Sequence, residues 1–264
     1  MDDATAVAGA FLRALDPVET FEAAVGPADP WQIDLLRSTS RRVLVNVARQ
    51  LGKSVVAAAI AVHRAVYAPG SLVLVLSPGE RQSAELLRKA RDVFAALGQP
   101  VREIAESVTK LELENGSRVL ALPGTERTVR GLSAVDLLIV DEASRVEDAL
   151  YQAVRPMLAV SGGRLLALST PWGRRGWWAD AWHSTEPWER VRVTAHDCPR
   201  ITPAFLEEER RSLPGWVFEQ EYLCIFAEAA GAVFREEDLQ AAFDPNLKPL
   251  FPPGDEIWRH VTSS

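Results

Sequence analysis

Three short segments of the chain hold side chains that can act on a phosphorylated ligand. The first is "VARQLGKS" at 47–54, where a run of β-branched residues leads into a turn ending in Gly52, Lys53 and Ser54. A strand, a tight turn with inward-pointing N–H groups, and a lysine and a hydroxyl that open a helix together form a phosphate loop. Val47 stands where the general pattern has its first glycine. Alone, the segment therefore fits either a phosphate site or an ordinary strand-to-helix turn.

The second segment is "VDLLIVDEAS" at 135–144, an apolar run that ends in Asp141 and Glu142. At the carboxyl end of a parallel strand, Asp141 can hold Mg²⁺ and Glu142 can polarise a water for attack on a γ-phosphate. The alternative is a helix start, with Asp141 as the N-cap and Glu142 in the first turn. Gly-Lys-Ser follows one strand and Asp-Glu follows a later strand about ninety residues on, and both are improbable together by accident, which favours the chemical interpretation of both.

The third segment, "LLALSTPWG" at 165–173, is an apolar run that ends in Ser169 and Thr170. Hydroxyl groups beside a catalytic carboxylate can sense whether the γ-phosphate is present and pass that state to a moving segment. A simple turn at the end of a strand is the alternative, and Ser-Thr-Pro satisfies it equally well.

The elements that must position these segments alternate along the chain. We expect strands at 43–47, 72–76, 137–140 and 164–169, and helices at 54–67 and 80–97. The strands are runs of consecutive and not alternating apolar residues, which is typical of a parallel sheet with helices on both faces. One exception is "LELENGSRVLAL" at 111–122, where Asn115 and Gly116 predict an antiparallel hairpin. The fold class is therefore α/β, a mainly parallel sheet flanked by helices, with a β-hairpin insertion.

The two ends of the chain have a different character. Residues 4–15 predict a leading helix, and the Pro/Gly-punctuated stretch 25–32 predicts a loop. After 195 the pattern becomes helical and acidic, with Phe218, Tyr222 and Phe226 as one packing stripe. We expect a catalytic core with its N-terminal helix at 1–195, a helical lid subdomain at 196–240 and a linker at 241–264.

Charge and composition limit the classes of partner. The 264 residues carry a formal net charge of −7, so the chain as a whole does not resemble a nucleic-acid or membrane-surface binder, and any DNA contact must be local. Cys198 and Cys224 lie far apart among only four histidines, which gives neither a disulfide framework nor a zinc site. This cysteine usage fits a reducing cytoplasm best. No targeting or membrane-spanning segment is evident.

The segments "ARQLGKS", "LLIVDEA", "LSTP" and "FEQEYLCIF" together resemble the large terminase subunit of tailed bacteriophages. That subunit is the ATPase motor that packs DNA into procapsids, and the resemblance covers most of residues 30–235. Its phosphate loop typically carries Arg-Gln where other loops have the first glycine, so the departure at the start of the loop is consistent with the family. The resemblance implies a RecA-like (ASCE) P-loop fold in which the first two segments are the Walker A and Walker B motifs.

The resemblance also implies roles for individual residues. Lys53 would hold the β- and γ-phosphates, Ser54 and Asp141 would organise Mg²⁺, and Glu142 would activate water. The adenine contact would come from Gln32 in "DPWQ". The nucleotide would further be contacted by Arg49, Gln50, Leu51 and Gly52, and hydrolysis would be coupled to motion through Ser169 and Thr170.

Two groups of arginines have several possible tasks. Arg127 and Arg130 precede the Asp-Glu strand, and in motors of this kind an arginine in this region is often the finger that completes a neighbour's site, so we favour Arg130. Solvated loop arginines are the alternative. In "PWGRRGWWADAWHSTEPW" at 171–188, helical spacing of tryptophans favours core packing over base stacking, and DNA gripping by Arg174 and Arg175 is the lesser hypothesis.

The expected function is Mg²⁺-dependent ATP hydrolysis that drives double-stranded DNA into viral procapsids. By resemblance, the motor would be a homo-oligomeric ring, a pentamer, working with the portal protein and the small terminase subunit in the host cytoplasm, docked on the procapsid. An isolated monomer would bind DNA weakly, and we expect no nuclease activity from this chain. The alternatives are a helicase-like or remodelling P-loop ATPase, and an ATP-gated module for ring assembly.

Overall fold

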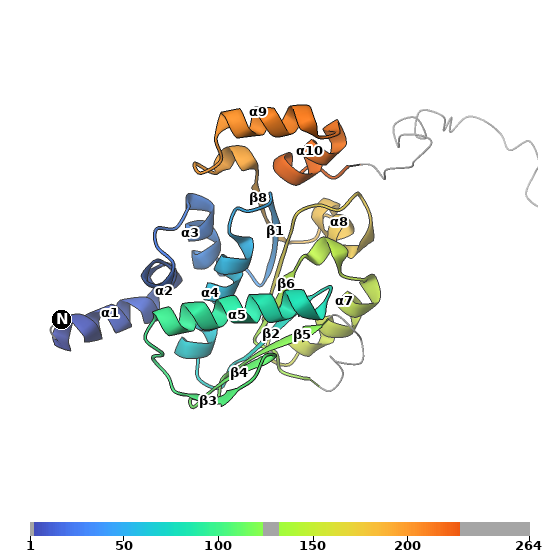
Figure 1. The fold of residues 1–264 in the computed structure, drawn as a ribbon. Helices are drawn as coiled ribbons and strands as arrows, with labels where there is room; N and C mark the ends of the chain where they lie inside the picture. The colour runs from blue at the N-terminus through green and yellow to red at the C-terminus, as the bar shows by residue number, and fades with distance from the viewer. Residues whose placement is uncertain (1–2, 124–131, 228–264) are drawn as a thin grey trace, which may run out of the picture. The chain divides into compact units, whose positions relative to one another are not determined.

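An eight-stranded sheet in the order β3-β4-β5-β2-β6-β7-β1-β8 forms the centre of the molecule (Figure 1). The structure is a computed structural model that describes residues 3–123 and 132–227. In chain order the strands are β1 (Arg42–Val47), β2 (Leu72–Ser77), β3 (Glu103–Glu106), β4 (Lys110–Leu113), β5 (Arg118–Pro123), β6 (Leu137–Asp141), β7 (Arg164–Ser169) and β8 (Glu189–Val193).

Most of this sheet is parallel, as the apolar runs predict. All the pairings from β5 through β2, β6, β7 and β1 to β8 are parallel, whereas β3 pairs with β4, and β4 with β5, in antiparallel fashion. The β4–β5 turn contains Asn115 and Gly116, and Gly116 has a φ of 83°. Since β5 also pairs with β2, the hairpin widens the main sheet and is part of it.

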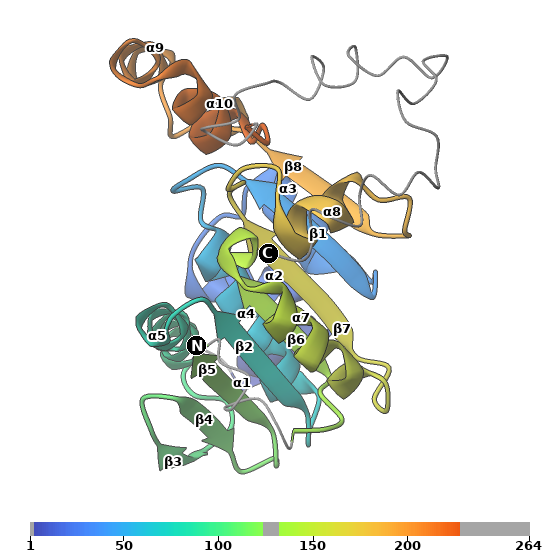
Figure 2. The same cartoon turned by 90° about the vertical axis from the view of Figure 1, so that its right-hand side faces the viewer.

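Helices cover both faces of the sheet (Figure 2). One face carries α4 and α5 with the short helices α2 and α3, and the other carries α7 and α8. Along β1, Val43 and Val45 face the first layer and Leu44 faces the second, which explains why consecutive residues of the strand are apolar. The helices are α1 (Asp3–Leu15), α2 (Pro17–Ala24), α3 (Pro30–Arg37), α4 (Lys53–Tyr67), α5 (Glu80–Ala96), α7 (Asp148–Val154), α8 (Gly176–His183), α9 (Pro203–Ser212) and α10 (Gly215–Leu223).

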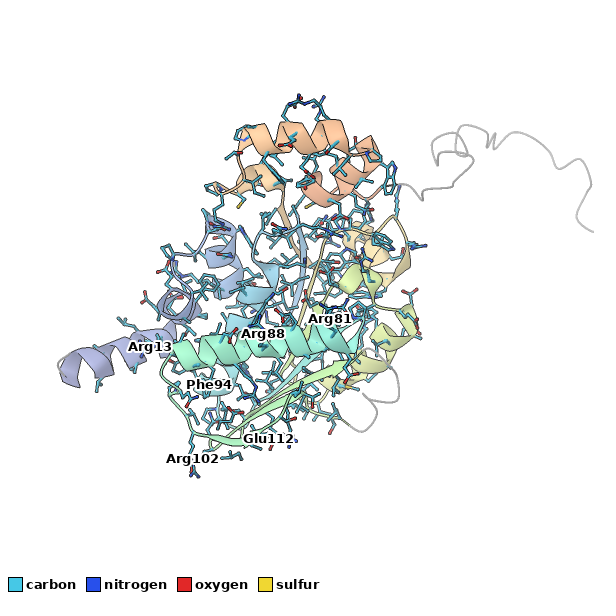
Figure 3. The ribbon with its side chains drawn as sticks, viewed as in Figure 1. Arg13, Arg81, Arg88, Phe94, Arg102 and Glu112 are labelled. Atoms are coloured by element: carbon cyan, nitrogen blue, oxygen red, sulfur yellow. The ribbon has the colours of Figure 1, made fainter. Side chains whose placement is uncertain are left out.

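Helix α5 shows how sequence pattern sets helix orientation (Figure 3). Leu86, Leu87 and Phe94 are buried against the sheet, while Arg88 lies on the exposed side and pairs with Glu85 and Asp92. The charged residues cover the solvent side and the apolar residues repeat at helical spacing, as an amphipathic helix requires.

The structure corrects the expected element assignment at both ends. The loop expected at 25–32 is present at 25–29, and α2 and α3 on either side of it are additional helices, each of which begins with a proline at its first position. Proline is favoured there because its fixed φ suits the first helical turn, where its missing N–H is not needed. Strands β3 (EIAE) and β8 (ERVRV) are additional edge strands, which are short and charged and lack the continuous apolar runs of the central strands.

The tryptophan-rich segment packs in the core, as its spacing predicts. Trp177 and Trp178 are buried, and Trp177 stacks on Tyr151 with ring centroids 3.9 Å apart. The expected stripe on the last helix is wrong at one position. Helix α10 ends at Leu223, where Cys224 turns the chain with a φ of 57°, so Phe226 packs on Trp182 and not along the helix.

Residues Met1–Ala227 form one compact unit, and within it α9 and α10 lie together at the top of Figure 1, beyond the ends of β1 and β8. The division between a core at 1–195 and a lid at 196–240 stays a prediction, and residues 228–264 lie outside the described residues. None of the helices in the described ranges combines the length and the apolar composition that crossing a bilayer requires.

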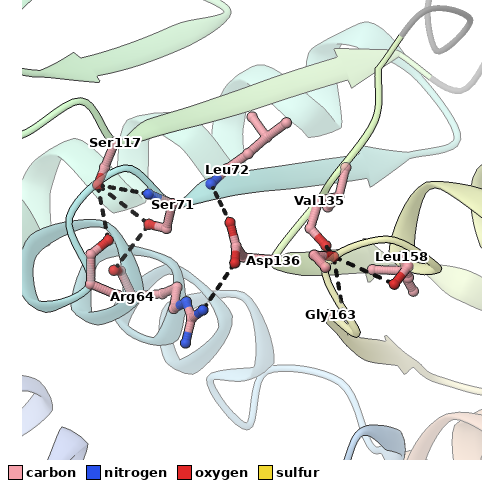
Figure 4. Close-up of polar contacts among 10 residues, drawn as sticks. Arg64, Ser71, Leu72, Ser117, Val135, Asp136, Leu158 and Gly163 are labelled. Carbon is pink, nitrogen blue, oxygen red and sulfur yellow. Dashed lines mark hydrogen bonds and ion pairs between the residues drawn. The ribbon is translucent and has the colours of Figure 1, made fainter.

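A tight turn before β7 fixes the amino end of that strand (Figure 4). Gly163 donates its N–H to Leu158 O at 3.2 Å, and Ser161 Oγ donates to Val135 O. A Cβ atom at position 163 would lie 2.1 Å from Val135 O and 2.9 Å from Asp136 O, both backbone atoms that cannot move aside independently.

Gly163→Ala should therefore lower the free energy of unfolding by about 1–3 kcal/mol, the usual range for overpacking. Gly215→Ala is the matched control, because a Cβ there meets no atom within 4 Å and lies in a helix. It should be neutral or slightly stabilising. Urea unfolding of both variants measures the difference, and equal midpoints would contradict the steric argument.

Candidate active site

The candidate active site lies where β1, β7 and β6 end. These three strands are neighbours and parallel, so their carboxyl ends meet at one edge of the sheet. The loop 48–54 leaves β1 there, Ser169 and Thr170 end β7, and Asp141 and Glu142 end β6. The sheet therefore brings together the three segments that the sequence singles out.

The loop after β1 has the backbone shape of an anion cradle. Gln50 and Gly52 adopt positive φ values of 61° and 91°, and α4 begins directly afterwards at Lys53. Successive turns of this kind direct N–H groups inward, and the helix start adds positive partial charge. Leu51 is fully buried, so its side chain anchors the loop in the core and only its backbone remains to meet a ligand.

Two direct contacts join this loop to the end of β6. Lys53 Nζ lies 3.0 Å from Glu142 Oε1, and Ser54 Oγ donates to Asp141 Oδ2 at 3.2 Å. The Lys53 side chain is 13% exposed and that of Glu142 is 28% exposed, so the ion pair is partly shielded from water. The lysine-hydroxyl pair of one segment thus faces the carboxylate pair of the other.

The two carboxylates differ in their surroundings. Asp141 is buried, and burial raises the pKa of its carboxyl, opposed by the positive charge of Lys53. Glu142 has a left-handed backbone with a φ of 52°, and its N–H donates to Asp141 Oδ1 at 3.1 Å. A positive φ at a glutamate stores strain, and strain of this kind concentrates at functional sites.

The donor atoms at this edge suit a magnesium ion. Ser54 Oγ and the Asp141 carboxylate are hard oxygen donors, and burial raises the pKa of the Asp141 carboxyl although the positive charge of Lys53 opposes the shift. Beside them, Ser77 at the end of β2 has a buried hydroxyl without a hydrogen-bond partner. No cluster of three His, Cys, Asp or Glu side chains capable of holding a metal occurs in residues 3–123 and 132–227.

Ser169 and Thr170 connect the two halves of the site. Thr170 Oγ1 donates to Val47 O at 2.9 Å, at the entrance to the loop. Ser169 Oγ donates to Ser144 Oγ at 2.7 Å, just beyond Glu142. A displacement at the end of β7 would therefore alter the hydrogen bond to the end of β1, the hydrogen bond to the segment after Glu142, or both.

Arg49 and Gln32 flank the loop. The Arg49 side chain forms an ion pair with Glu221 of α10. The backbone N–H of Arg49 also donates to the backbone carbonyl of Glu221 at 3.3 Å. Gln32 is buried, its Oε1 accepts from Asp29 N at 2.9 Å, and its Nε2 lies 3.0 Å from where a Cβ of Gly52 would be. The roles expected of both residues toward a nucleotide stay predictions. Arg127 and Arg130 lie outside the described residues.

A cavity of about 400 Å³ opens directly beside these groups. Ser54, Asp141 and Glu142 line one side of it, and the first turns of α5 line the other. The α5 side chains were not singled out from the sequence. The signal available was "SPGERQS" at 77–83, because polar residues after β2 leave the same edge of the sheet as those after β1 and β6.

A family model described as the N-terminal part of the large terminase subunit, T4likevirus-type, matches residues 44–241. The chain belongs to this family. The large terminase subunit of Escherichia phage T5 is 29% identical over 202 residues, covering 74% of this chain and 46% of the relative. That of Thermus phage G20c is 26% identical over 244 residues, covering 79% and 50%. This terminase chain thus spans about half the length of the curated relatives it matches.

Solved structures of terminases share its fold. The large terminase ATPase domain of Thermus phage P74-26 superimposes with a TM-score of 0.69 at 23% identity, covering 78% of this chain and 97% of that domain. The large terminase of bacteriophage HK97 has a TM-score of 0.65 at 18% identity, covering 82% and 55%. The RecA-like fold class expected from the sequence is confirmed.

Asp141→Asn should raise the melting temperature of this terminase chain in EDTA, because it removes a buried charge while keeping the shape of the side chain. Asp92→Asn, on the exposed side of α5, is the control and should change little. Adding Mg²⁺ and ADP should stabilise the wild type more than Asp141→Asn. Scanning calorimetry measures both effects, and a destabilised Asp141→Asn in EDTA would contradict the cost assigned to the buried carboxylate.

Proposed function

We propose that this chain is the motor domain of a packaging terminase, which hydrolyses ATP with Mg²⁺ and uses the energy to move double-stranded DNA into a procapsid. The observation that carries the proposal is the pair of contacts from Lys53 to Glu142 and from Ser54 to Asp141. They bring a cation, a hydroxyl, a buried carboxylate and a second carboxylate together, which supports the proposal for a chain of the terminase family.

Binding of a triphosphate would exchange the partners of this cluster. The loop N–H groups and Lys53 would take the β- and γ-phosphates, which releases Lys53 from Glu142. Ser54 and Asp141 would hold Mg²⁺, which neutralises charge on the phosphate oxygens when bound. Glu142, freed from its ion pair, would accept a proton from the attacking water. The partial burial of Lys53 and Glu142 strengthens each of these interactions.

Coupling to motion would run through the end of β7. Thr170 is bonded to the strand that precedes the phosphate loop, and Ser169 to the segment that follows Glu142. Loss of the γ-phosphate would change the position of Glu142 or of the loop, and either change alters one of these hydrogen bonds. We assign the coupling role to both residues on that basis.

The wider assignment follows from the family. We infer a homo-oligomeric ring, a pentamer, in which Arg130 of one subunit completes the site of its neighbour. The ring would work with the portal protein and the small terminase subunit, in the host cytoplasm on the procapsid. The net charge of −7 supports weak DNA binding by a single subunit, since phosphate contacts by Lys and Arg dominate affinity for duplex DNA.

Glu142→Gln should bind ATP while losing about 10²- to 10⁴-fold in turnover, the usual contribution of a general base. Lys53→Ala should lose ATP binding as well, because it removes the phosphate cation. Glu186→Gln, far from the site and half exposed, is the control and should keep full activity. Phosphate release and binding of a fluorescent ATP analogue are measured at several protein concentrations. Turnover by Glu142→Gln at the wild-type rate would refute the assignment.

A further inference from the structure

The wall of the cavity opposite the carboxylates belongs to α5, a helix that the proposed mechanism has not used. Across the cavity of about 400 Å³ from Ser54, Asp141 and Glu142 stand Arg81, Gln82, Glu85, Leu86 and Lys89. Because one continuous space separates the two walls, a ligand bound at Ser54 and Asp141 is also within the reach of side chains on α5.

The first turn of α5 is held firmly in place. Ser83 is buried, and its Oγ donates to Leu122 O at 2.9 Å, on the neighbouring strand β5. A Cβ at Gly79, just before the helix, would lie 2.5 Å from Gln82 Oε1, so the absence of a side chain at Gly79 lets Gln82 fold closely over the turn. The backbone that carries Arg81 is therefore fixed relative to the sheet, and only the arginine side chain itself is free to adjust.

The cations of α5 differ in their partners. Arg88 pairs with Glu85 and Asp92, and Lys89 Nζ lies 4.0 Å from Glu85. Arg81 makes no ion pair with any residue that the structure describes, although it stands on the wall of a cavity whose opposite side holds two carboxylates. Figure 3 labels Arg81 at one end of α5 and Arg88 near its middle.

We propose that Arg81 is a further catalytic residue, a cation of the same subunit that contacts the terminal phosphate of the bound triphosphate. The proposal rests on the proposed function. Ser54 and Asp141 mark the metal side of the cavity and Glu142 marks the side of the attacking water, so the γ-phosphate is the part of the nucleotide that reaches this space.

The chemistry of arginine suits this contact. Its guanidinium stays charged at all accessible pH values and offers a planar fork that matches phosphate oxygens. Lys53 approaches from the loop side and Arg81 from the α5 side, so the two cations would act on the terminal phosphate from different directions. Charge that builds up on this phosphate during transfer is then stabilised by groups already in position.

The test compares Arg81→Ala with Arg88→Ala, an arginine on the same helix that is not among the cavity-lining residues and pairs with neighbouring carboxylates. Calorimetric titration with Mg²⁺ and either a non-hydrolysable ATP analogue or ADP measures both affinities. Arg81→Ala should weaken binding of the analogue about tenfold or more, the usual effect of losing a charged hydrogen bond, and change ADP binding less than about twofold. Arg81→Lys should recover part of the loss, and Arg88→Ala should match the wild type.

Two results would overturn the proposal. One is wild-type binding of the analogue by Arg81→Ala. The other is an equal loss for the analogue and for ADP, which would place Arg81 at the inner phosphates or in a structural role. Lys53→Ala distinguishes failure of the Arg81 proposal from failure of the proposed function. If both Arg81→Ala and Lys53→Ala bind the analogue normally, the nucleotide site itself is misplaced. If Lys53→Ala loses binding while Arg81→Ala keeps it, only the role of Arg81 is wrong.

Discussion

The parallel pairing of β1, β7 and β6 is the constraint on which the site depends. It directs three loops toward one edge, and its register sets which side chains share a face. Asp141 pairs with Leu168 of β7, and Asp141 lies on the same face as Ile139, beneath α4 and α5. A shift of one residue would turn the carboxylate to the opposite face and break its contact with Ser54. The packing of the apolar strands, which holds this register, therefore also determines the position of the Asp141 carboxylate relative to Ser54.

Several features at this edge of the sheet are unfavourable for the stability of the fold, and the packing of the apolar core must offset them. Asp141 is a buried anion, Glu142 has a positive φ, and Ser77 leaves a buried hydroxyl without a partner. The positive charge of Lys53 compensates part of the charge of Asp141, and Lys53 also pairs with Glu142. An ion pair that is only partly buried can be exchanged for a stronger one, such as a phosphate, without breaking the fold.

The sequence predicts features that depend on local pattern and fails where contacts are distant. Lys53, Ser54, Asp141 and Glu142 could be placed because continuous apolar strands and the polar residues that end them are visible in the chain. Edge strands such as β8 were missed because they mix charges with apolar residues. Helix α5 has the charge spacing of an ordinary surface helix, so its approach to the carboxylates becomes visible only when β2 is placed beside β6.

The attachment of α10 shows how such distant contacts give the site its mechanical connections. Neighbouring residues of this helix hold two segments at once: Glu221 pairs with Arg49 of the phosphate loop, and Gln220 Oε1 accepts from Gly173 N at 3.1 Å, just after Thr170. Glu221 is only 13% exposed. If Arg49 left it for a phosphate, an uncompensated carboxylate would remain beneath the surface, which is unfavourable unless α10 shifts to expose it. The position of α10 and the partner of Arg49 are therefore energetically linked.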